Sequence, residues 1–491
     1  MHVDPGLRRL ALRTLLAAYP GPTPPDWALS LVRDGLAGFT IFGRNIENAD
    51  QLARATGALR AVRPDVLLAI DEEGGDVTRL AHATGSPYPG NAALGTVGDT
   101  TLTEQVYRAI GHELAALGIN VNLAPTVDVN TADDNPIIGT RSFGSDPRQV
   151  ADHSAAAVRG LQADRVAACA KHFPGHGATT TDSHHDLPTV DVPLSVLRTR
   201  DLPPFAAVVE AGVQAVMTAH IRVPVLTGDG PATFSRAVLS DLLRHEYGFT
   251  GAVVTDALEM AGAAAPAGGI GPAAVRALRA GADLLCIGAR VDAALVEAVA
   301  ADIAAAIVSG ALDRARVEEA AIRVDGLATW ATLPATRRPA PDRLGYVAAR
   351  RAVRVEGTVS GLVRPLVVQL VSSSTIAEGP VPWGLAPHLA GAEQLRVVAA
   401  TADADALRAR ARDRPIVVVG RHVHRLPGGR ELVEALAARH PVTVVEMGWP
   451  SGWRPADVRA FVTTYGASHA NGRAAAEVLG LAPPLPVDLA G

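Results

Sequence analysis

Lysine is almost absent from this chain. Lysine and arginine together number 45 in 491 residues, and the one lysine stands at position 171. The lysine ammonium is compact and rotatable, whereas the arginine guanidinium is a wide planar fork. A sequence that uses arginine at every other such position indicates that position 171 needs the smaller cation.

Cysteine and long apolar runs are scarce as well. Cys169 and Cys286 each lie in a short apolar run, so we interpret them as small buried hydrophobes and not as a disulfide. No run of 18 apolar residues occurs, which argues against a membrane span and a membrane partner. Residues 1–20 show no convincing signal peptide. The sequence therefore predicts a soluble, cytoplasmic protein.

The chain also has no large excess of positive or negative charge. The net charge is −5, and no basic stripe or tail stands out, which excludes a nucleic-acid partner. Hydrophobic residues make up 48% of the chain and charged residues 19%, so a large core can form. The length of 491 residues favours two domains.

Short apolar runs alternate with segments of helical periodicity over the first two thirds of the chain. The strands that we expect there are 37–42, 66–71, 119–124, 166–172, 189–192, 215–220, 251–256 and 282–288. The fifth of them has the weakest pattern. Helices are expected between them, for example at 49–62, 101–117, 148–162, 235–247 and 271–280. Eight strands alternating with helices predict a (β/α)8 barrel, an α/β fold of the TIM type.

A proline- and arginine-rich segment at 333–345 interrupts this pattern and is interpreted as a linker. Apolar runs resume beyond it at 366–370, 396–399, 415–420 and 442–447. They predict a smaller α/β sandwich domain with a partly parallel sheet. The expected division is a barrel domain at 1–332, the linker, and a C-terminal domain at 346–491.

Polar residues cluster where the predicted barrel strands end, which is the face that carries the active site in such barrels. They are Asp71 and Arg79 after the second strand, Asp128, Asn135 and Arg141 after the third, Lys171 and His172 on the fourth, His220 after the sixth, and Asp256 after the seventh. Capping or loop contacts stay open as alternatives for Asp71 and Arg141. Turn chemistry is equally open for Asp128 and Asn135.

Asp256 emerges directly from the apolar run Val-Val-Thr. A carboxylate there is unfavourable unless it is paired or hydrogen-bonded, so we expect it to face the pocket. Such a group can attack an electrophilic carbon and form a covalent intermediate.

The segment that follows the lysine contains a candidate acid/base pair. His184 titrates near neutral pH, and Asp182 can orient its ring and raise its pKa. The glycines and threonines of this segment indicate a mobile loop, which could bring the pair onto a substrate. A solvated polar loop is the alternative. His176 and His185 carry a weaker signal of the same kind.

Several histidines near one lysine also suggest a second hypothesis, a metal-dependent barrel hydrolase. Barrel hydrolases of that kind need a His-x-His pair after the first strand, and here the run 37–42 is followed by Gly-Arg-Asn. We therefore predict no metal and no other cofactor. His422 and His424 in the second domain are interpreted as loop residues.

At these residues the sequence resembles the family 3 glycoside hydrolases, specifically their bacterial β-N-acetylglucosaminidase branch. The most specific match is the segment 171–177, Lys-His-Phe-Pro-Gly-His-Gly, followed by Asp-Ser-His at 182–184. This is similar to the signature of the branch that uses a His–Asp dyad where related β-glucosidases use glutamate. The resemblance implies that His184 is the proton donor and acceptor, Asp182 its partner and Asp256 the nucleophile.

The resemblance also assigns a set of substrate-binding residues to the sugar hydroxyls and the N-acetyl side. They are Asp71, Arg79, Arg141, Lys171 and His172. Two departures from the family pattern are Glu72, where many relatives carry glutamine, and Ala257, where some carry a second aspartate. The C-terminal domain is similar to that of two-domain members, and because the barrel loop already supplies the dyad, this domain need not contribute to the chemistry.

The expected enzyme is a retaining, exo-acting β-N-acetylglucosaminidase that forms a covalent glycosyl-enzyme on Asp256. After protonating the leaving group, His184 is neutral, whereas a glutamate would be anionic and would repel phosphate. A phosphorylase that uses phosphate as the acceptor therefore stays an alternative, as does a β-glucosidase with dual specificity. A catalytically silent sugar-binding protein would tend to have lost Asp256 or the dyad. The substrate class is an N-acetylglucosaminide, which could be a muropeptide, a chito-oligosaccharide or another compound of this class. Cytoplasmic placement favours peptidoglycan recycling.

Overall fold

The computed structural model describes residues 4–184, 186–335, 341, 343–389 and 391–486, which fall into two compact units. The first unit takes its residues from 1–73, 103–138 and 144–340, and the second from 74–102, 139–143 and 341–491. His185 and part of the predicted linker lie outside the described residues. Two segments from the first third of the chain thus pack with the C-terminal residues.

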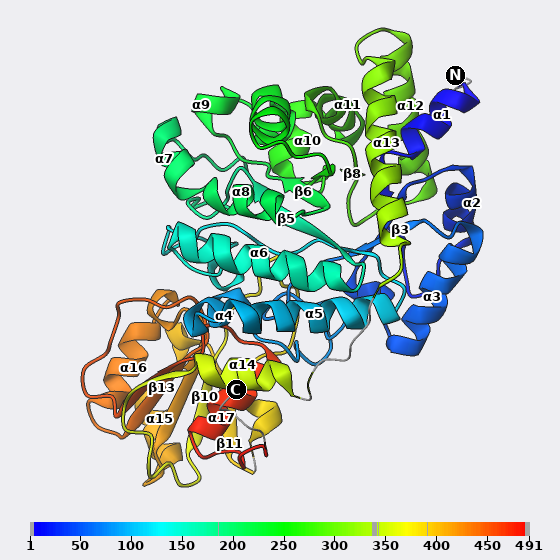
Figure 1. Cartoon of the computed structure of the whole chain (residues 1–491). Helices are drawn as coiled ribbons and strands as arrows, with labels where there is room; N and C mark the ends of the chain where they lie inside the picture. The colour runs from blue at the N-terminus through cyan, green and yellow to red at the C-terminus, as the bar shows by residue number, and fades with distance from the viewer. Residues whose placement is uncertain (1–3, 185, 336–340, 342, 390, 487–491) are drawn as a thin grey trace. The chain divides into compact units, whose positions relative to one another are not determined.

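The first unit is a parallel eight-stranded barrel (Figure 1). Its strands are β1 Leu15–Ala17, β2 Gly38–Ile41, β3 Leu67–Ile70, β4 Val121–Asn122, β5 Ala167–Phe173, β6 Ala215–Thr218, β7 Ala252–Thr255 and β8 Leu285–Cys286. They follow one another around the sheet in chain order, β8 pairs with β1, and a bridge between Val254 and Leu284 joins β7 to β8. The predicted (β/α)8 fold is confirmed.

The fifth predicted strand is wrong. Residues 189–192 form no barrel strand, and Thr189 makes only an isolated bridge to Arg222. The eighth strand is instead β1, whose three buried residues are too few to show a periodic pattern. The first four predicted strands therefore correspond to β2, β3, β4 and β5. The last three predicted strands correspond to β6, β7 and β8.

Helices alternate with these strands along the chain. They are α1 Pro5–Leu12, α2 Asp26–Asp34, α3 Ala49–Val62, α5 Thr100–Ala116, α6 Pro147–Ala163, α7 Leu194–Arg200, α8 Pro203–Glu210, α9 Pro224–Thr227, α10 Ala261–Ala267, α11 Ile270–Ala280, α12 Ala293–Val308 and α13 Arg314–Ala331. The helix expected at 235–247 is a π-helix, η4 Ala237–Glu246. Helix α3 has the predicted bounds, and its Asn48 side chain accepts the Gln51 N–H as an N-cap. No described helix combines the length and the apolarity needed to cross a bilayer.

The barrel interior is filled by alternate strand residues, as period-two geometry requires. This cluster includes Leu67 and Ala69 of β3, Cys169 of β5 and Cys286 of β8. Both cysteines are buried and unpaired with each other, so the interpretation as small core residues is confirmed. Burial raises the pKa of the Cys169 thiol, which keeps it protonated.

The second unit is built on a six-stranded sheet. In spatial order its strands are β11 Glu393–Val397, β10 Leu366–Leu370, β12 Ile416–Gly420, β13 Val442–Glu446, β14 Ala460–Thr463 and β9 Arg354–Gly357. Only the edge strand β9 pairs antiparallel among these described strands. The central strands are buried throughout, because helices cover both faces of a parallel sheet. The predicted α/β sandwich is confirmed, although β9 and β14 were missed.

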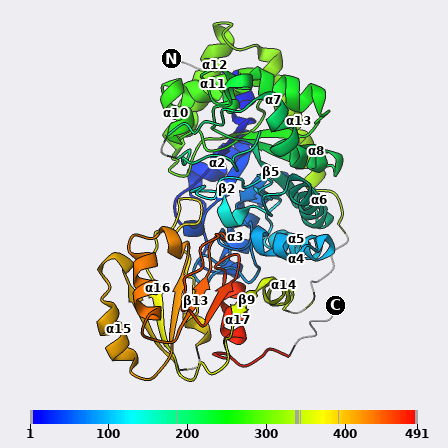
Figure 2. The ribbon, with the colours of Figure 1, turned by 90° about the vertical axis from the view of Figure 1, so that its left-hand side faces the viewer.

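Helices cover both faces of this sheet (Figure 2). On one face lie α14 Leu344–Ala352 and α17 His469–Val478, and on the other lie α15 Ala404–Ala411 and α16 Gly429–Ala437. Helix α4 Asn91–Val97 comes from the earlier segment and packs against α14. The shorter turns are 3-10 helices, η1 Gly43–Asn45, η2 Gly139–Arg141, η3 Ala232–Phe234, η5 Ala386–His388, η6 Ala399–Thr401 and η7 Val423–Arg425.

Candidate active site

Lys171 lies near the C-terminal end of β5 and joins two acidic residues that follow β3. Its Nζ is 2.7 Å from Oδ1 of Asp71 and 2.7 Å from Oε1 of Glu73. The lysine side chain is only 3% exposed. Glu73 also accepts a hydrogen bond of 3.2 Å from the Thr126 hydroxyl. A compact ammonium fits between the two carboxylates. Glu73 follows Asp71 by two residues in the sequence, but nothing in the sequence indicated that both pair with Lys171.

His172 is held by a fully buried carboxylate. Its Nδ1 donates to Oδ2 of Asp128 over 2.7 Å, and Oδ1 of Asp128 accepts the N–H groups of His172 and His176. Burial acts to raise the pKa of Asp128, but His172 and His176 outweigh it and lower that pKa. Asp128 therefore stays ionised and orients the imidazole, so its contacts are more than local turn chemistry.

The backbone of β5 is irregular at these residues. In a regular strand Lys171 and His172 would face opposite sides of the sheet. The pairing register between β5 and β6 shifts between Ala170 and Phe173, as at a β-bulge. Such irregularities re-aim side chains near active sites. Here Lys171 contacts Asp71, which follows β3, and His172 contacts Asp128, which follows β4.

The structure brings Asp182 and His184 together. Oδ1 of Asp182 accepts both Nδ1–H and the backbone N–H of His184, over 2.7 Å and 2.9 Å. The His184 side chain is 23% exposed, so solvent reaches it. The loop that carries the pair is anchored, because the Ser183 carbonyl accepts the N–H of Gly262 at the start of α10.

His176 and Asn135 stabilise the same loop from within. The two ring nitrogens of His176 lie 2.7 Å from the Thr179 hydroxyl and 3.2 Å from the Ser183 hydroxyl. Burial lowers the pKa of His176 to about 4, so its ring is neutral at physiological pH. The side-chain amide of Asn135 donates to the His176 carbonyl. These two residues hold the loop together.

Asp256 follows β7 and is partly exposed. Its Oδ1 accepts the N–H of Ala257 over 2.8 Å. Burial acts to raise its pKa, but the imidazoles of His220, His172 and His184 outweigh it, and the pKa is lowered to about 2. Asp256 is therefore an ionised carboxylate with three histidines close enough to act on it electrostatically.

His220 supports the backbone beside Asp256. Its Nε2 lies 3.1 Å from the Ala257 carbonyl, and its Nδ1 lies 2.7 Å from the Thr233 hydroxyl. Burial lowers the pKa of His220, which favours a neutral ring. A carbonyl can only accept, so Nε2 carries the proton. The imidazole thus fixes the residue that follows the carboxylate.

The two arginines predicted to bind substrate belong to the second unit. Arg79 donates from Nη2 to the Ala377 carbonyl over 2.8 Å and from Nη1 to the Glu378 carbonyl over 3.4 Å. Arg141 ends the turn η2, is 7% exposed, and accepts at its carbonyl a bond from the Asn91 amide. Both residues are thus supported by the unit that contains the C-terminal sheet, which the sequence pattern did not indicate.

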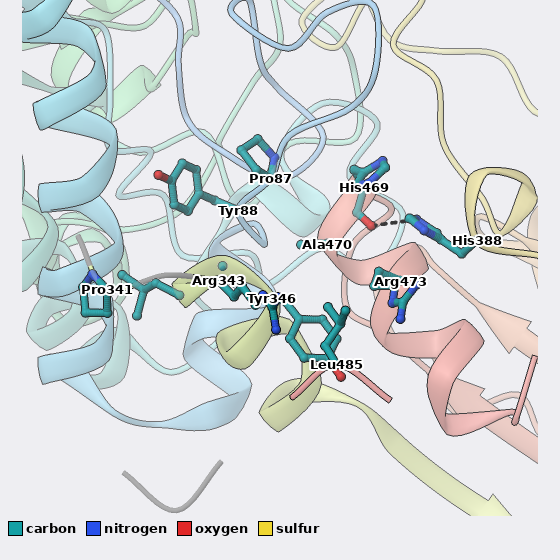
Figure 3. A pocket seen from close by; sticks show the side chains of 12 residues that line it. Pro87, Tyr88, Pro341, Arg343, Tyr346, His388, His469, Ala470, Arg473 and Leu485 are labelled. Carbon is teal, nitrogen blue, oxygen red and sulfur yellow. Dashed lines mark hydrogen bonds between the residues drawn. The ribbon is translucent and has the colours of Figure 1, made fainter. Parts of the chain in front are cut away.

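The second unit also contains a hollow of about 370 Å³ between α14 and α17 (Figure 3). Arg343, His388, His469 and Arg473 are among the side chains that line it. The Nε2 of His388 lies 3.1 Å from the His469 carbonyl. The dashed line in Figure 3 marks this hydrogen bond. Burial lowers the pKa of His388 to about 4. None of the residues predicted for the active site lines this hollow.

Our prediction of no metal site took the run 37–42 as the first strand of the barrel, and that assignment is wrong. The first strand is β1, and it is followed by Ala-Tyr-Pro, which also lacks a His-x-His pair. Among the residues that the structure describes, no three His, Cys, Asp or Glu side chains are arranged to hold a metal ion. His422 directly precedes the turn η7, and His424 lies within it.

A family model described as "Glycosyl hydrolase family 3 N terminal domain" matches residues 26–327. This chain belongs to glycosyl hydrolase family 3. The predicted family and the predicted enzyme class, a glycoside hydrolase, are confirmed.

The family 3 relatives of this chain include several β-hexosaminidases. Over 332 residues it is 36% identical to β-hexosaminidase A of Pseudoalteromonas piscicida, a match that covers 62% of this chain and 55% of that protein. Over 280 residues it is 39% identical to the β-hexosaminidase of Stenotrophomonas maltophilia (strain R551-3), covering 55% and 81% of the two chains. The chain thus spans about half the length of the Pseudoalteromonas protein.

A solved structure matches both units. It is the glycoside hydrolase family 3 β-N-acetylglucosaminidase from Paenibacillus sp. str. FPU-7, with a TM-score of 0.85 and 31% identity over 98% of each chain. The β-N-acetylhexosaminidase from Beutenbergia cavernae, at 30% identity and a TM-score of 0.59, covers 67% of this chain and all of its own. The two-unit architecture therefore occurs in a solved family member.

Proposed function

We propose that this enzyme is a retaining, exo-acting β-N-acetylglucosaminidase that removes terminal β-linked N-acetylglucosamine. The observation that carries the proposal is that the imidazole of His184, which Asp182 orients, acts electrostatically on an ionised Asp256. Three histidines, His184 among them, lower the pKa of Asp256 to about 2 against the effect of burial. A carboxylate nucleophile and an imidazole acid/base are the two groups that a double displacement needs.

In the first step Asp256 attacks the anomeric carbon. The bond from that carbon to the leaving oxygen breaks, and His184 gives its Nε2 proton to that oxygen. Nδ1 of His184 donates to Asp182, which fixes the ring and stabilises its protonated form before transfer. The products are the free leaving group and a sugar ester of Asp256.

In the second step the neutral His184 takes a proton from water. The water oxygen attacks the anomeric carbon, and Asp256 leaves as a carboxylate. Two inversions give net retention. Because the imidazole is neutral at this stage, it does not repel an anionic acceptor, so phosphate in place of water is the alternative outcome of the same chemistry.

The remaining predicted site residues bind the sugar in this proposal. Lys171 holds Asp71 and Asp128 holds His172 for this role. Arg79 and Arg141 are assigned to the sugar by the family resemblance. The assignment of residues 1–332 as the catalytic domain, the cytoplasmic location and a role in recycling muropeptides or chito-oligosaccharides also belong to the proposal.

The test is release of nitrophenol from 4-nitrophenyl β-N-acetylglucosaminide by the wild type and by Asp256→Asn. We expect turnover by the wild type and none by the variant. Asp191→Asn, an exposed aspartate after the dyad loop, is the matched control and should keep full activity. Absence of turnover by folded wild type would overturn the aminosugar specificity. NMR identifies which anomer of the released sugar forms first, which distinguishes retention from inversion. Addition of phosphate then shows whether a sugar phosphate forms.

A further inference from the structure

We propose that Arg421, in the second unit, is a positioning residue for substrate binding, because it holds the segments that carry Arg79. The inference rests on the proposed function, in which Arg79 binds the sugar. It assigns the C-terminal sheet a part in positioning Arg79.

Arg421 follows β12 and joins two parts of the second unit. Its side chain is 9% exposed, and Nη2 lies 3.1 Å from Oε1 of Glu378 and 3.5 Å from Oδ2 of Asp76. The guanidinium carbon lies 5.3 Å from the centre of the Trp383 ring, within cation–π range. A buried cation thus binds one carboxylate that precedes Arg79 by three residues and another from the loop after β10.

Asp76 is fixed on its other sides as well. Its Oδ1 accepts the N–H of Ala467 over 2.8 Å, and its Oδ2 accepts the Thr140 hydroxyl over 2.7 Å. Thr140 directly precedes Arg141. Asp76 therefore links the two arginine-bearing segments to each other and to the C-terminal residues.

Glu378 connects Arg421 to Arg79 by a second route. Its carboxylate binds Arg421, while its carbonyl and that of Ala377 accept the guanidinium of Arg79. A short turn fixes this loop, because the Glu378 N–H donates to the Thr375 hydroxyl and the Glu378 carboxylate accepts the Thr375 N–H. A change at Arg421 would be transmitted to Arg79 through Glu378.

The place of this network in the sheet supports the inference. The chain leaves β10 for β11 on one side and returns to β12 on the other, so the strand order reverses there. Open α/β sheets bind ligands at the carboxyl ends of the strands at such a point. Glu378 and Trp383 follow β10, and Arg421 follows β12. With Asp76 among them, about 10 Å³ of space is left, which is at most the room for one water.

The crevice where such a sheet would hold a separate ligand is therefore filled by the chain's own segment at Asp76. At the edge where such sheets bind ligands, Arg421 instead binds Asp76 and Glu378, which lie close to Arg79. This edge accordingly positions the segments that hold Arg79.

The test compares kcat and KM of the full chain with Arg421→Met, on 4-nitrophenyl β-N-acetylglucosaminide. Loss of ground-state binding raises KM and leaves kcat nearly unchanged, so we expect a KM rise of roughly tenfold with kcat within about threefold. Arg454→Met is the matched control. Arg454 pairs with Glu356 on the exposed edge strand β9, and its loss should leave KM unchanged.

A double variant separates positioning from general destabilisation. If Arg421 acts through Arg79, Arg421→Met should add no further KM rise to Arg79→Met, whereas independent effects would multiply. Multiplied effects would overturn the inference. An unchanged KM in Arg79→Met alone would instead show that Arg79 does not bind the sugar, and absent turnover in the wild type would overturn the proposed function itself.

Glu378→Gln serves if Arg421→Met does not fold. This variant keeps both carbonyls that hold Arg79 and removes only the charge that binds Arg421. We expect a KM rise of roughly threefold, smaller than for Arg421→Met because the backbone bonds remain. Arg421→Lys should restore part of the wild-type KM. A folded Glu378→Gln with wild-type KM would overturn the inference.

Discussion

Nζ of Lys171 lies 2.7 Å from Oδ1 of Asp71, a residue 100 positions earlier in the chain. The same ammonium lies 2.7 Å from Glu73. Removing one partner of a buried ion pair leaves a buried charge uncompensated, at a cost of about 3–5 kcal/mol. The contact fixes Asp71 at the end of β3, where the proposal needs it.

The first prediction concerns the size of this cation. Lys171→Arg keeps the charge, but the wider guanidinium must displace Asp71 or Glu73. A shift of about 1 Å at a catalytic site can reduce the rate roughly 100-fold, and we expect a loss of kcat/KM of that order. Steady-state kinetics with thermal unfolding measures it. Arg159→Lys, in an exposed pair with Glu104, is the control. Equal activity of the two variants would contradict our interpretation of the single lysine.

The second prediction concerns the orientation of His172. Asp128→Asn replaces one acceptor oxygen with an NH₂ donor in a buried site that presents three N–H groups. A buried donor without an acceptor costs about 1–3 kcal/mol. We expect a lower melting temperature and a kcat/KM reduced at least about tenfold. Unchanged kinetics in a destabilised variant would mean that the His172 ring need not be held for turnover.

The third prediction concerns His184. His184→Ala should lower kcat/KM roughly 10²–10⁴-fold for a chito-disaccharide, whose leaving group needs a proton. Nitrophenyl substrates, whose leaving group departs unprotonated, should lose much less in this step. The comparison of kcat/KM for the two substrates measures the difference. Equal losses for both would remove His184 from the role of general acid.

The fourth prediction concerns pH and stability. Asp201 is fully buried, and a Cβ added at Gly175 would lie 2.8 Å from the Cβ of Asp201. Burial raises the pKa of Asp201 to about 6, against the lowering effect of Arg200. Between pH 3.8 and about 6 the folded state holds the proton that the unfolded chain has lost. Stability from this group therefore falls as pH rises through that window.

Removing the ionisable group should remove this pH dependence. Relative to Asp201→Asn, the wild type should lose up to about 3 kcal/mol of unfolding free energy from about pH 4 to about pH 7. Urea unfolding at several pH values measures the difference. Asp152→Asn, an exposed aspartate on α6, should follow the wild type. Parallel curves for the wild type and Asp201→Asn would contradict the prediction.

Much of the fold could be predicted because buried strands and helices have their own sequence periods. The run Ile416–Gly420 is fully buried and stood out as an apolar block, and α3 was predicted to the residue. The errors came from short elements. Strand β1 has three residues, and residues 189–192 alternate like a strand but pair through one bridge.

By itself, the sequence determined the contacts that are local in the chain. Asp182 meets His184 two residues later, and Asp256 follows directly from an apolar strand, so their chemistry could be inferred from spacing. Tertiary structure alone decided that Glu73 shares Lys171 and that Asp128 holds His172. It also decided that Arg79 is held by carbonyls almost 300 positions away. Barrel closure and sheet packing set which distant carboxylates and carbonyls meet a given side chain, and no periodicity in the sequence encodes those distances.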